Sequence, residues 1–572
     1  MLDHYEAARK CLDSCVKGFV SEMNYDNPNA YNYLTYSPMV AITHDSHIDK
    51  NIITNGAAIL WSLYYIEDLE YYKNEDCLKK ALQVFKEVYG AMYSDGTFDN
   101  YITNFHDPAH SGFVIEGAAE ILEFCYNKMG NTPIELELKE LTLDYVNKLA
   151  HAICNFGFHT PNHRWVQCAA LSFAYKYLKC PEFLERINKF FAEGIDCDEN
   201  GEYTERSAGN YSRICDCSFM MYSHFSNTTD KYEYVRRNLN LVLSYIEPDN
   251  TIMSLNSTRQ DVGFNSNISI YYKEFLELAI IDENPYYAWM CDEIVRNNNG
   301  LSSTYLSYYM LANSPEYIEK MRRIDSKPIP KDRSRFLSES LIYRKYIPKW
   351  NATCSVIGGP LTPFFFKLQF GKHRVFGRIA SSFFGEPHSK FRPQTLEENP
   401  DGSFTLTSVE SQGYRTPLEE PQGTPYWRHM DHSKREWTNI QTLIRKTTFR
   451  FEEDEIVIDV SAEKTDNVPC KLEFVFVPEP NAFFLSDDID IGLKAGYYIV
   501  GTHEFKVIYG ISEPCISISG CKYEHRYAET MKGSEPYDGK TFVVASTFLS
   551  PSEHQVRIKF HKVPLHDWSK EN

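Results

Sequence analysis

The sequence predicts two unlike domains, an all-α toroid of helical hairpins followed by an antiparallel β-sandwich. Apolar residues recur at helical spacing in the first half of the 572-residue chain and with a period of two in the second half. Between them, two prolines and mixed charges at 324–335 interrupt both patterns and mark a linker. We therefore expect the all-α domain at 1–323 and the sandwich at 336–572.

The first half reads as successive helices joined by polar loops. The clearest begins at Thr132-Pro133, where a capping threonine, a first-turn proline and Glu135 form a capping box. Another begins at Thr160-Pro161. Further helices are expected at about 5–22, 52–72, 77–91, 112–127, 181–193, 213–226, 231–246, 268–280, 286–297 and 303–312. The absence of a fixed-period sequence repeat favours a closed toroid over a TPR or HEAT solenoid.

The second half reads as short strands. Leu472, Phe474 and Phe476 alternate with residues of the opposite face, which is typical of a half-buried strand. Other strands are expected at 363–370, 444–451, 455–461, 504–509, 541–548 and around 556–560. The stretch 385–438 is polar, rich in Pro, Gly, His and Arg, and poor in strand signal, so we expect a long functional loop there.

Composition narrows the possible partners. A net charge of −19 repels nucleic acid and anionic membrane, so neither is expected. The 15 cysteines lack CxxC pairs, which indicates reduced buried thiols rather than a zinc site. We expect no required cofactor, and a structural cation in the sandwich stays open. The charged amphipathic N-terminus is unlike a signal peptide, so a cytoplasmic location is expected.

The first candidate site lies at the start of the helix after Thr160. Asn162 and His163 would occupy the first turn, where free N–H groups and the helix dipole favour an anion. Together with Arg164 they could grip a carboxylate, and Trp165 adds a ring of the kind that lines sugar sites. Ordinary helix-start preferences are the alternative explanation.

The second candidate site is the loop 198–211, which contains Glu205, Arg206 and Tyr211. A tyrosine there can donate or accept a proton if a neighbouring cation lowers its pKa. The alternative is a decorated surface loop.

Two further clusters are less specific. His106, Asp107 and His110 could bind a metal, although capping of the following helix is the favoured interpretation. In the second half, a locally basic stretch includes His388 and Arg392, and a solvated charged loop is the alternative there. Its members are Arg378, Glu386, His388, Lys390, Arg392, Arg428, His429 and His432.

The Asn162-His163 pair and the pattern D-x-x-G-x-Y-x-E-x-S-x-x-x-Y from Asp198 to Tyr211 resemble the heparinase II/III-like polysaccharide lyases. The resemblance implies a helical toroid with a β-sandwich, and β-elimination at a 4-linked uronic acid. It implies an acidic oligosaccharide or polysaccharide as the partner.

The resemblance also suggests roles for the candidate residues. Asn162 would neutralise the uronate carboxylate, Tyr211 would act as acid and possibly base, and His163 is the alternative base. A further group from the sandwich is expected to be His388. The expected substrate-binding residues are Arg164, Glu205, Arg206, His106, Arg392 and Trp165.

Two other functions stay open from the sequence. A glycoside hydrolase on the same toroid would need two facing carboxylates, for which Asp95 or Asp99 with Glu205 are available. A non-catalytic glycan-binding protein would use its aromatic residues as a platform. The particular uronate glycan, endo or exo cleavage and the oligomeric state also stay open.

Overall fold

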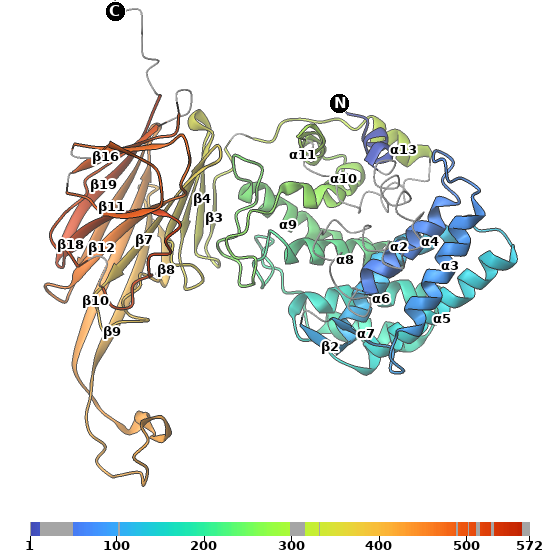
Figure 1. The fold of residues 1–572 in the computed structure, drawn as a ribbon, viewed down its shortest axis with the longest axis horizontal. Coiled ribbons are helices and arrows are strands. Elements are labelled where there is room, and N and C mark those ends of the chain that lie inside the picture. The colour runs from blue at the N-terminus through green and yellow to red at the C-terminus, as the bar shows by residue number, and fades with distance from the viewer. Residues whose placement is uncertain are drawn as a thin grey trace, which may run out of the picture. The chain divides into compact units, whose positions relative to one another are not determined.

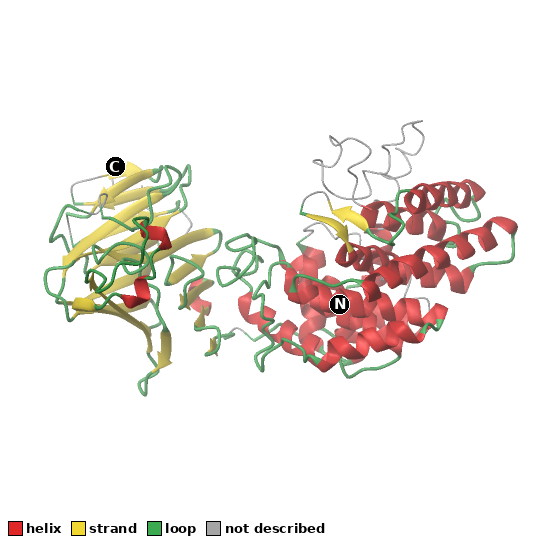
Figure 2. Ribbon diagram, turned by 90° about the horizontal axis from the view of Figure 1, so that it is seen from below, coloured by secondary structure: helices red, strands yellow, loops and turns green. Residues whose placement is uncertain are grey.

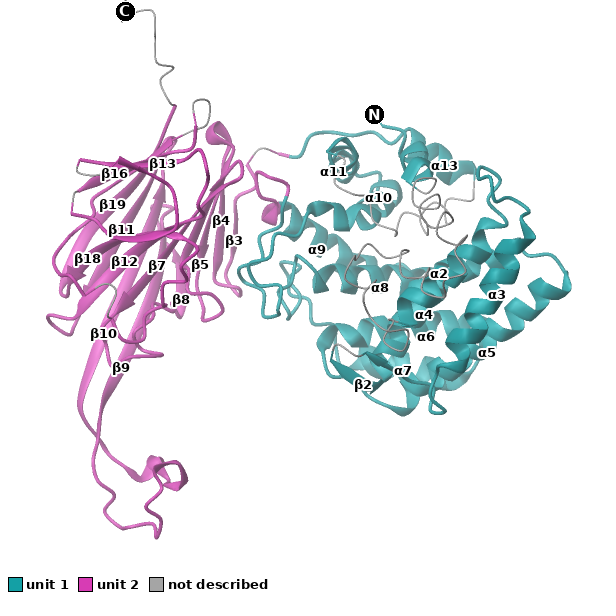
Figure 3. Cartoon of the chain, in the orientation of Figure 1, with its two compact units in different colours: residues 1–243, 251–329 teal, residues 244–250, 330–572 magenta. Residues whose placement is uncertain are grey.

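The computed structural model divides the chain into two compact units, shown in Figure 3. The helical unit comprises residues 1–243 and 251–329, and the sandwich unit comprises 244–250 and 330–572. The helical unit consists mainly of α-helices and the sandwich unit mainly of strands (Figure 2). The residues that the structure describes are 2–11, 50–100, 103–297, 315–330, 332–487, 490–501, 503–510, 515–527 and 531–562.

The helical unit is built from hairpins packed side by side. Helices α2, α4, α6 and α8 contact one another in sequence, and α3, α5 and α7 pack outside them. The difference in burial follows this layering, because most of α6 is buried whereas α7 buries only Phe183, Ile187 and Phe190 on one stripe. The predicted toroid is confirmed. The bounds of the helices are α2 (Lys50–Leu63), α3 (Glu75–Gly90), α4 (Pro108–Lys128), α5 (Pro133–Asn155), α6 (Pro161–Leu178), α7 (Pro181–Ala192), α8 (Tyr211–Ser226), α9 (Tyr232–Tyr245), α10 (Tyr272–Ile281), α11 (Pro285–Arg296) and α13 (Pro315–Arg322).

Local sequence signals set most helix starts. The capping box at Thr132 is present, with its hydroxyl accepting from the Glu135 N–H and Glu135 accepting from the Thr132 N–H. Thr160 occupies the N-cap position of α6 but makes no side-chain capping bond. The helix expected at 52–72 ends at Leu63 and is followed by turns. The sequence did not predict helix α13.

Two expected helices reach beyond the described residues. Of the helix expected at 5–22, residues 4–11 are helical and the rest lies outside the described chain. The helix expected at 303–312 lies wholly outside it. None of the described helices is both long and apolar enough to span a membrane.

The sandwich unit has two sheets, as predicted. One has the order β14-β13-β16-β17-β19-β11-β10-β9-β8, and the other β15-β18-β12-β7-β6-β5-β4-β3. All strand pairs described are antiparallel except β15 with β18, which is parallel. The strands are β3 (Arg335–Leu337), β4 (Ile342–Ile347), β5 (Ala352–Ile357), β6 (Phe366–Phe370), β7 (His373–Ser381), β8 (Thr395–Glu398), β9 (Phe404–Arg415), β10 (Trp437–Phe451), β11 (Glu455–Glu463), β12 (Pro469–Phe476), β13 (Phe483–Ser486), β14 (Asp490–Gly492), β15 (Gly496–Ile499), β16 (Glu504–Ile508), β17 (Cys515–Ser519), β18 (Phe542–Leu549) and β19 (Ser552–His561).

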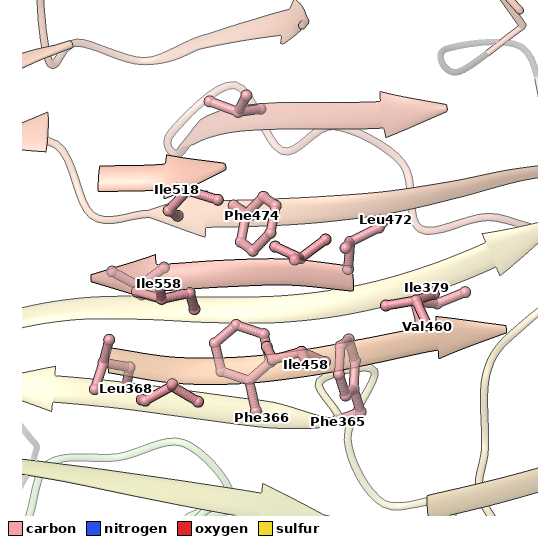
Figure 4. Packing of buried hydrophobic residues seen from close by; sticks show 14 of the residues in the cluster. Phe365, Phe366, Leu368, Ile379, Ile458, Val460, Leu472, Phe474, Ile518 and Ile558 are labelled. Carbon is pink, nitrogen blue, oxygen red and sulfur yellow. The ribbon is translucent and has the colours of Figure 1, made fainter. Parts of the chain in front are cut away.

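The core between the sheets follows from the period of two. Leu472 and Phe474 of β12 point into it with Ile458 and Ile558 of the other sheet (Figure 4). The alternate residue Glu473 pairs instead with Lys471, 2.7 Å away. The outer face of this central strand therefore carries a buried charge pair next to the apolar side chain of Val475.

The stretch 385–438 is not the strandless loop that the sequence suggested. It contains β8 and β9 and the first residues of β10. Residues 411–441, which we call the arm, form the distal part of the β9–β10 hairpin and reach far beyond the neighbouring strands (Figure 1). Both faces of the arm are largely exposed, so the sequence there lacks the alternation that marks a half-buried strand.

Glu247 is the buried centre of the segment 244–250 within the sandwich unit. Its carboxylate lies 3.1 Å from Nη2 of Arg344 and 2.8 Å from Nζ of Lys367, and it accepts a hydrogen bond from Thr353. Burial by itself would raise the pKa of Glu247, but Arg344 and Lys367 outweigh it and hold the pKa at about 2. The segment is thus bound to β4, β5 and β6 by an ionised carboxylate.

We expect Glu247→Gln to lower the free energy of unfolding of the sandwich unit by about 3–5 kcal/mol, because two buried cations lose their counter-charge. Calorimetric melting of the full chain measures this. Glu453→Gln, at an exposed pair with Lys349, is the matched control and should change little. Equal melting of both variants would contradict the role given to Glu247.

Candidate active site

Asn162 lies in the first turn of α6 and is completely buried. Its Nδ2 donates to Oε2 of Glu205 across 2.7 Å. Because a carboxylate accepts but does not donate, this contact fixes which way the amide faces. Among the described residues, Oδ1 of Asn162 has no hydrogen-bond partner. An amide that is buried, oriented and incompletely satisfied is typical of a functional position.

Glu205 connects this helix start to a second loop. Its Oε1 lies 3.3 Å from Nε of Arg259, and its backbone carbonyl accepts from both the N–H and the hydroxyl of Thr258. Burial raises the pKa of Glu205, while the hydrogen bond from Asn162 and the charge of Arg259 oppose that shift. The carboxylate therefore serves as the link between Asn162 and Arg259.

Tyr211 is the first residue of α8 and is held on three sides. Its hydroxyl accepts a hydrogen bond from the Gln260 side-chain amide, and the Arg259 guanidinium lies 5.0 Å from its ring centre. Its backbone N–H donates to Oγ of Ser207, which in turn donates to Asp261. Arg259 is thus a cation that lies directly beside the Tyr211 ring.

Arg259 and Gln260 were missed by sequence reasoning. They lie in the sequence TRQDV, a polar loop without a motif, some fifty residues after Tyr211. Lys and Arg occur throughout the helical half, so no local pattern marks these two residues.

His163 follows Asn162 in α6 and is nearly buried. Its ring meets Phe113 and His159 edge-on, at centroid distances of 5.7 and 4.8 Å. Burial, together with the neighbouring His159, lowers the pKa of His163 to about 4, so the imidazole is neutral near pH 7. Within the described chain, its Nδ1 has no hydrogen-bond partner.

The side chains of Arg164 and Trp165 contact Asp196, whereas Asn162 contacts Glu205. Arg164 lies 3.0 Å from Asp196 and 3.3 Å from Glu193, and the Trp165 indole N–H donates to Asp196. Trp165 is only 1% exposed. Both side chains therefore stabilise the 193–196 loop. Arg206, in the turn before Tyr211, has a positive φ of 50°.

The β1–β2 hairpin (Phe98–Asn100 and Asn104–Asp107) adjoins the start of α6. His106 pairs with Asp95 at 3.0 Å and stacks on Tyr93 at 4.0 Å. Asn104 reaches Nε2 of His159 at 3.5 Å, which links the hairpin to the ring beside His163.

Asp107 caps α4 by accepting from the Ala109 N–H, which is the favoured interpretation of that cluster. No group of three or more His, Cys, Asp or Glu side chains among the described residues could hold a metal ion.

His388 and Arg392 lie in the sandwich unit, between β7 and β8. Nε2 of His388 accepts from Gln412 at 2.8 Å, so Nδ1 carries the hydrogen that is donated to Glu410 at 2.7 Å. Arg392 lies 3.7 Å from Glu386. The imidazole is therefore oriented by a carboxylate, and its part in catalysis stays a prediction.

No protein-family model and no curated protein matches the sequence. Among solved structures, a mutant of the heparan sulfate lyase HepC from Pedobacter heparinus matches with a TM-score of 0.51 at 11% identity, over 89% of this chain and 75% of that chain. The chain has a heparinase-like polysaccharide lyase fold. The resemblance drawn from the motifs is confirmed at the level of this lyase fold.

Two further solved structures are similar to the chain with lower TM-scores. The Streptomyces coelicolor A3 chondroitin AC lyase, in complex with chondroitin sulphate, has a TM-score of 0.49 at 10% identity, over 98% of this chain and 81% of that chain. The unsaturated glucuronyl hydrolase from Bacillus sp. GL1 has a TM-score of 0.37 at 12% identity, over 56% of this chain and 97% of that chain.

The burial of neutral His163 predicts a pH dependence of stability. In the unfolded chain the imidazole takes up a proton near pH 6.5, and in the folded chain only near pH 4. Between these values the unfolded state binds more protons, so stability falls as the pH falls, by up to about 3 kcal/mol.

Melting temperatures measured across this pH range should therefore fall less steeply for His163→Gln than for the unaltered chain. His429→Gln, at an exposed histidine, serves as the control and should retain the original slope. Parallel slopes for all three proteins would show that His163 is protonated in the folded state.

Proposed function

We propose that the protein is a lyase that cleaves a 4-linked uronic-acid glycan by β-elimination. The observation that carries the proposal is the continuous linkage from the Asn162 amide through Glu205 and Arg259 to the Tyr211 ring. A carboxamide can neutralise the uronate carboxylate and a phenol can transfer a proton, and this elimination needs both functions. The lyase fold supports the same assignment.

The first requirement is neutralisation of the substrate carboxylate. Removal of the C5 proton places negative charge on the carboxylate next to it, so donors must already point there. The Asn162 amide has two N–H bonds, and only one of them is directed to Glu205. The second N–H, with Arg259 held nearby by Glu205, can meet the substrate carboxylate.

The second requirement is proton transfer. Gln260 donates to the Tyr211 oxygen and Arg259 lies over the ring, so negative charge that develops on this oxygen is stabilised from two directions. In the proposed reaction, the Tyr211 oxygen takes the C5 proton as the phenolate and passes this proton to the leaving oxygen on C4, which restores the phenolate. Neutral His163 is the alternative base for the first of these steps.

The contacts favour elimination over hydrolysis. A hydrolase would need Glu205 and a second carboxylate to face the bond that is cleaved. Glu205 is buried against Asn162 and Arg259, and Asp95 is bound to Thr97 and His106. Asp99 accepts hydrogen bonds from the Tyr93 hydroxyl and the His106 N–H. The proposed substrate is an acidic oligosaccharide or polysaccharide, and the elimination needs no cofactor.

Tyr211→Phe should reduce turnover by about 10²–10⁴-fold, because the hydroxyl that moves the proton is removed. Turnover is followed by the ultraviolet absorbance of the conjugated double bond that elimination creates. Tyr222→Phe, the same change on the same helix, should retain activity. New reducing ends without that absorbance would refute the lyase assignment, and binding without any turnover would indicate a glycan-binding protein.

Asn162→Ala should lower kcat by about 10²–10³-fold with a smaller effect on KM, because the lost N–H acts mainly on the charge of the transition state. Steady-state kinetics on a uronate oligosaccharide measures both constants. Asn155→Ala, at an exposed asparagine near the end of α5, is the control. A loss confined to KM would place Asn162 in ground-state binding only.

A further inference from the structure

The arm, residues 411–441, is a two-stranded ribbon that contacts the rest of the sandwich unit at its base, where Gln412 meets His388 and the Tyr414 ring lies 5.5 Å from that of Phe384. Strand β8 pairs with β9 only as far as Thr407, and β11 pairs with β10 only from Ile444. Between these points, β9 and β10 pair with each other alone, within the part of the chain that the structure describes. An isolated ribbon of this kind is only marginally stable in water, so its surface needs other contacts.

The arm exposes large apolar side chains along its length and at its tip. Trp427 at the tip is 61% exposed and Ile440 on β10 is 59% exposed. Exposed aromatic residues gathered on one element typically mark an interaction surface. The exposed apolar side chains of the arm are Tyr414, Tyr426, Trp427, Trp437 and Ile440.

At the tip of the arm, neighbouring side chains hold the Trp427 ring in place. The His432 ring lies 4.1 Å from that of Trp427 and donates to the Trp427 carbonyl. Arg435 lies over the Trp427 ring, 5.0 Å from its centre, and donates to the carbonyl of Thr416 and to Nδ1 of His432. Because these side chains are already fixed, little conformational entropy would be lost on association.

The neutral charge of the arm favours a second copy of the chain as its partner. The whole chain carries −19, whereas the arm has four basic side chains, Arg415, Arg428, Lys434 and Arg435, and four acidic ones, Glu419, Glu420, Asp431 and Glu436. Two copies of the chain repel each other over most of their surfaces, but not at a neutral, aromatic arm. The 31 residues of the arm also match the roughly 20–30 residues that each partner contributes to a stable interface.

We propose that two copies of the chain associate through their arms, arm against arm about a twofold axis. Such a contact is self-complementary, so each neutral aromatic surface meets its own copy. The proposal is independent of the proposed lyase activity, because the exposed side chains that it uses, from Tyr414 to Ile440, do not include Gln412, the neighbour of His388.

Sedimentation velocity and light scattering of the full chain test the proposal over a range of protein concentrations. We expect a species of twice the 66.5 kDa chain mass. Trp427→Ser should weaken the dimer at least about 30-fold, as expected for a central aromatic contact. Tyr523→Ser, at a comparably exposed tyrosine outside the arm, should leave it unchanged.

A second variant removes the distal part of the arm, with Tyr426 and Trp427, and leaves the pairing of β9 with β10 at its base in place. Arg415 and Trp437 are paired across the hairpin, so residues 416–436 can be replaced by a two-residue Asn-Gly turn. This variant should be monomeric and should melt like the unaltered chain.

Salt gives an independent readout, because screening the repulsion between acidic copies should strengthen the dimer. A chain that is monomeric at every concentration, a dimer that survives loss of the arm, or a dimer that salt weakens would overturn the proposal.

Discussion

Buried carboxylates that must find a counter-charge are the constraint on which both units depend. A carboxylate removed from water is costly unless cations or hydrogen-bond donors surround it. In the sandwich unit, Glu247 meets this requirement with Arg344 and Lys367. In the helical unit, Lys273 pairs with Glu120 and Arg213 pairs with Glu274 between the inner helices. Each pair fixes the relative position of elements that are far apart in the sequence.

Glu205 is a buried carboxylate of the same kind within the candidate site. Its charge is buried at the meeting point of the α6 start and the 254–264 loop, and Asn162 and Arg259 are the groups that satisfy it. Removing either partner would leave an uncompensated carboxylate, so the geometry of the candidate site is tied to the stability of the fold around it. This explains how a loop and two helix starts hold an amide and a phenol in fixed orientations.

Helix starts provide the remaining part of the site. Asn162 and Tyr211 both lie in first turns, where side chains at the end of a helix are directed away from its body and N–H groups remain available. The neutral state of His163 follows from burial in the same turn. The reacting groups of such a site lie on rigid helices, while the loops between the helices supply the groups that orient them, Glu205, Arg259 and Gln260.

The sequence by itself determined the class of fold and the local features. The period of two set the sandwich core around Leu472 and Phe474, and the capping box at Thr132 set a helix start, because both depend on residues close in the sequence. The Asn162-His163 pair was recognised for the same reason. Only the tertiary structure brought Arg259 and Gln260 to Tyr211, and Arg344 to Glu247, since pairing across fifty to a hundred residues leaves no local pattern. The sequence of the arm predicts a loop, because a ribbon exposed on both faces lacks the alternation of apolar and polar residues that marks a strand.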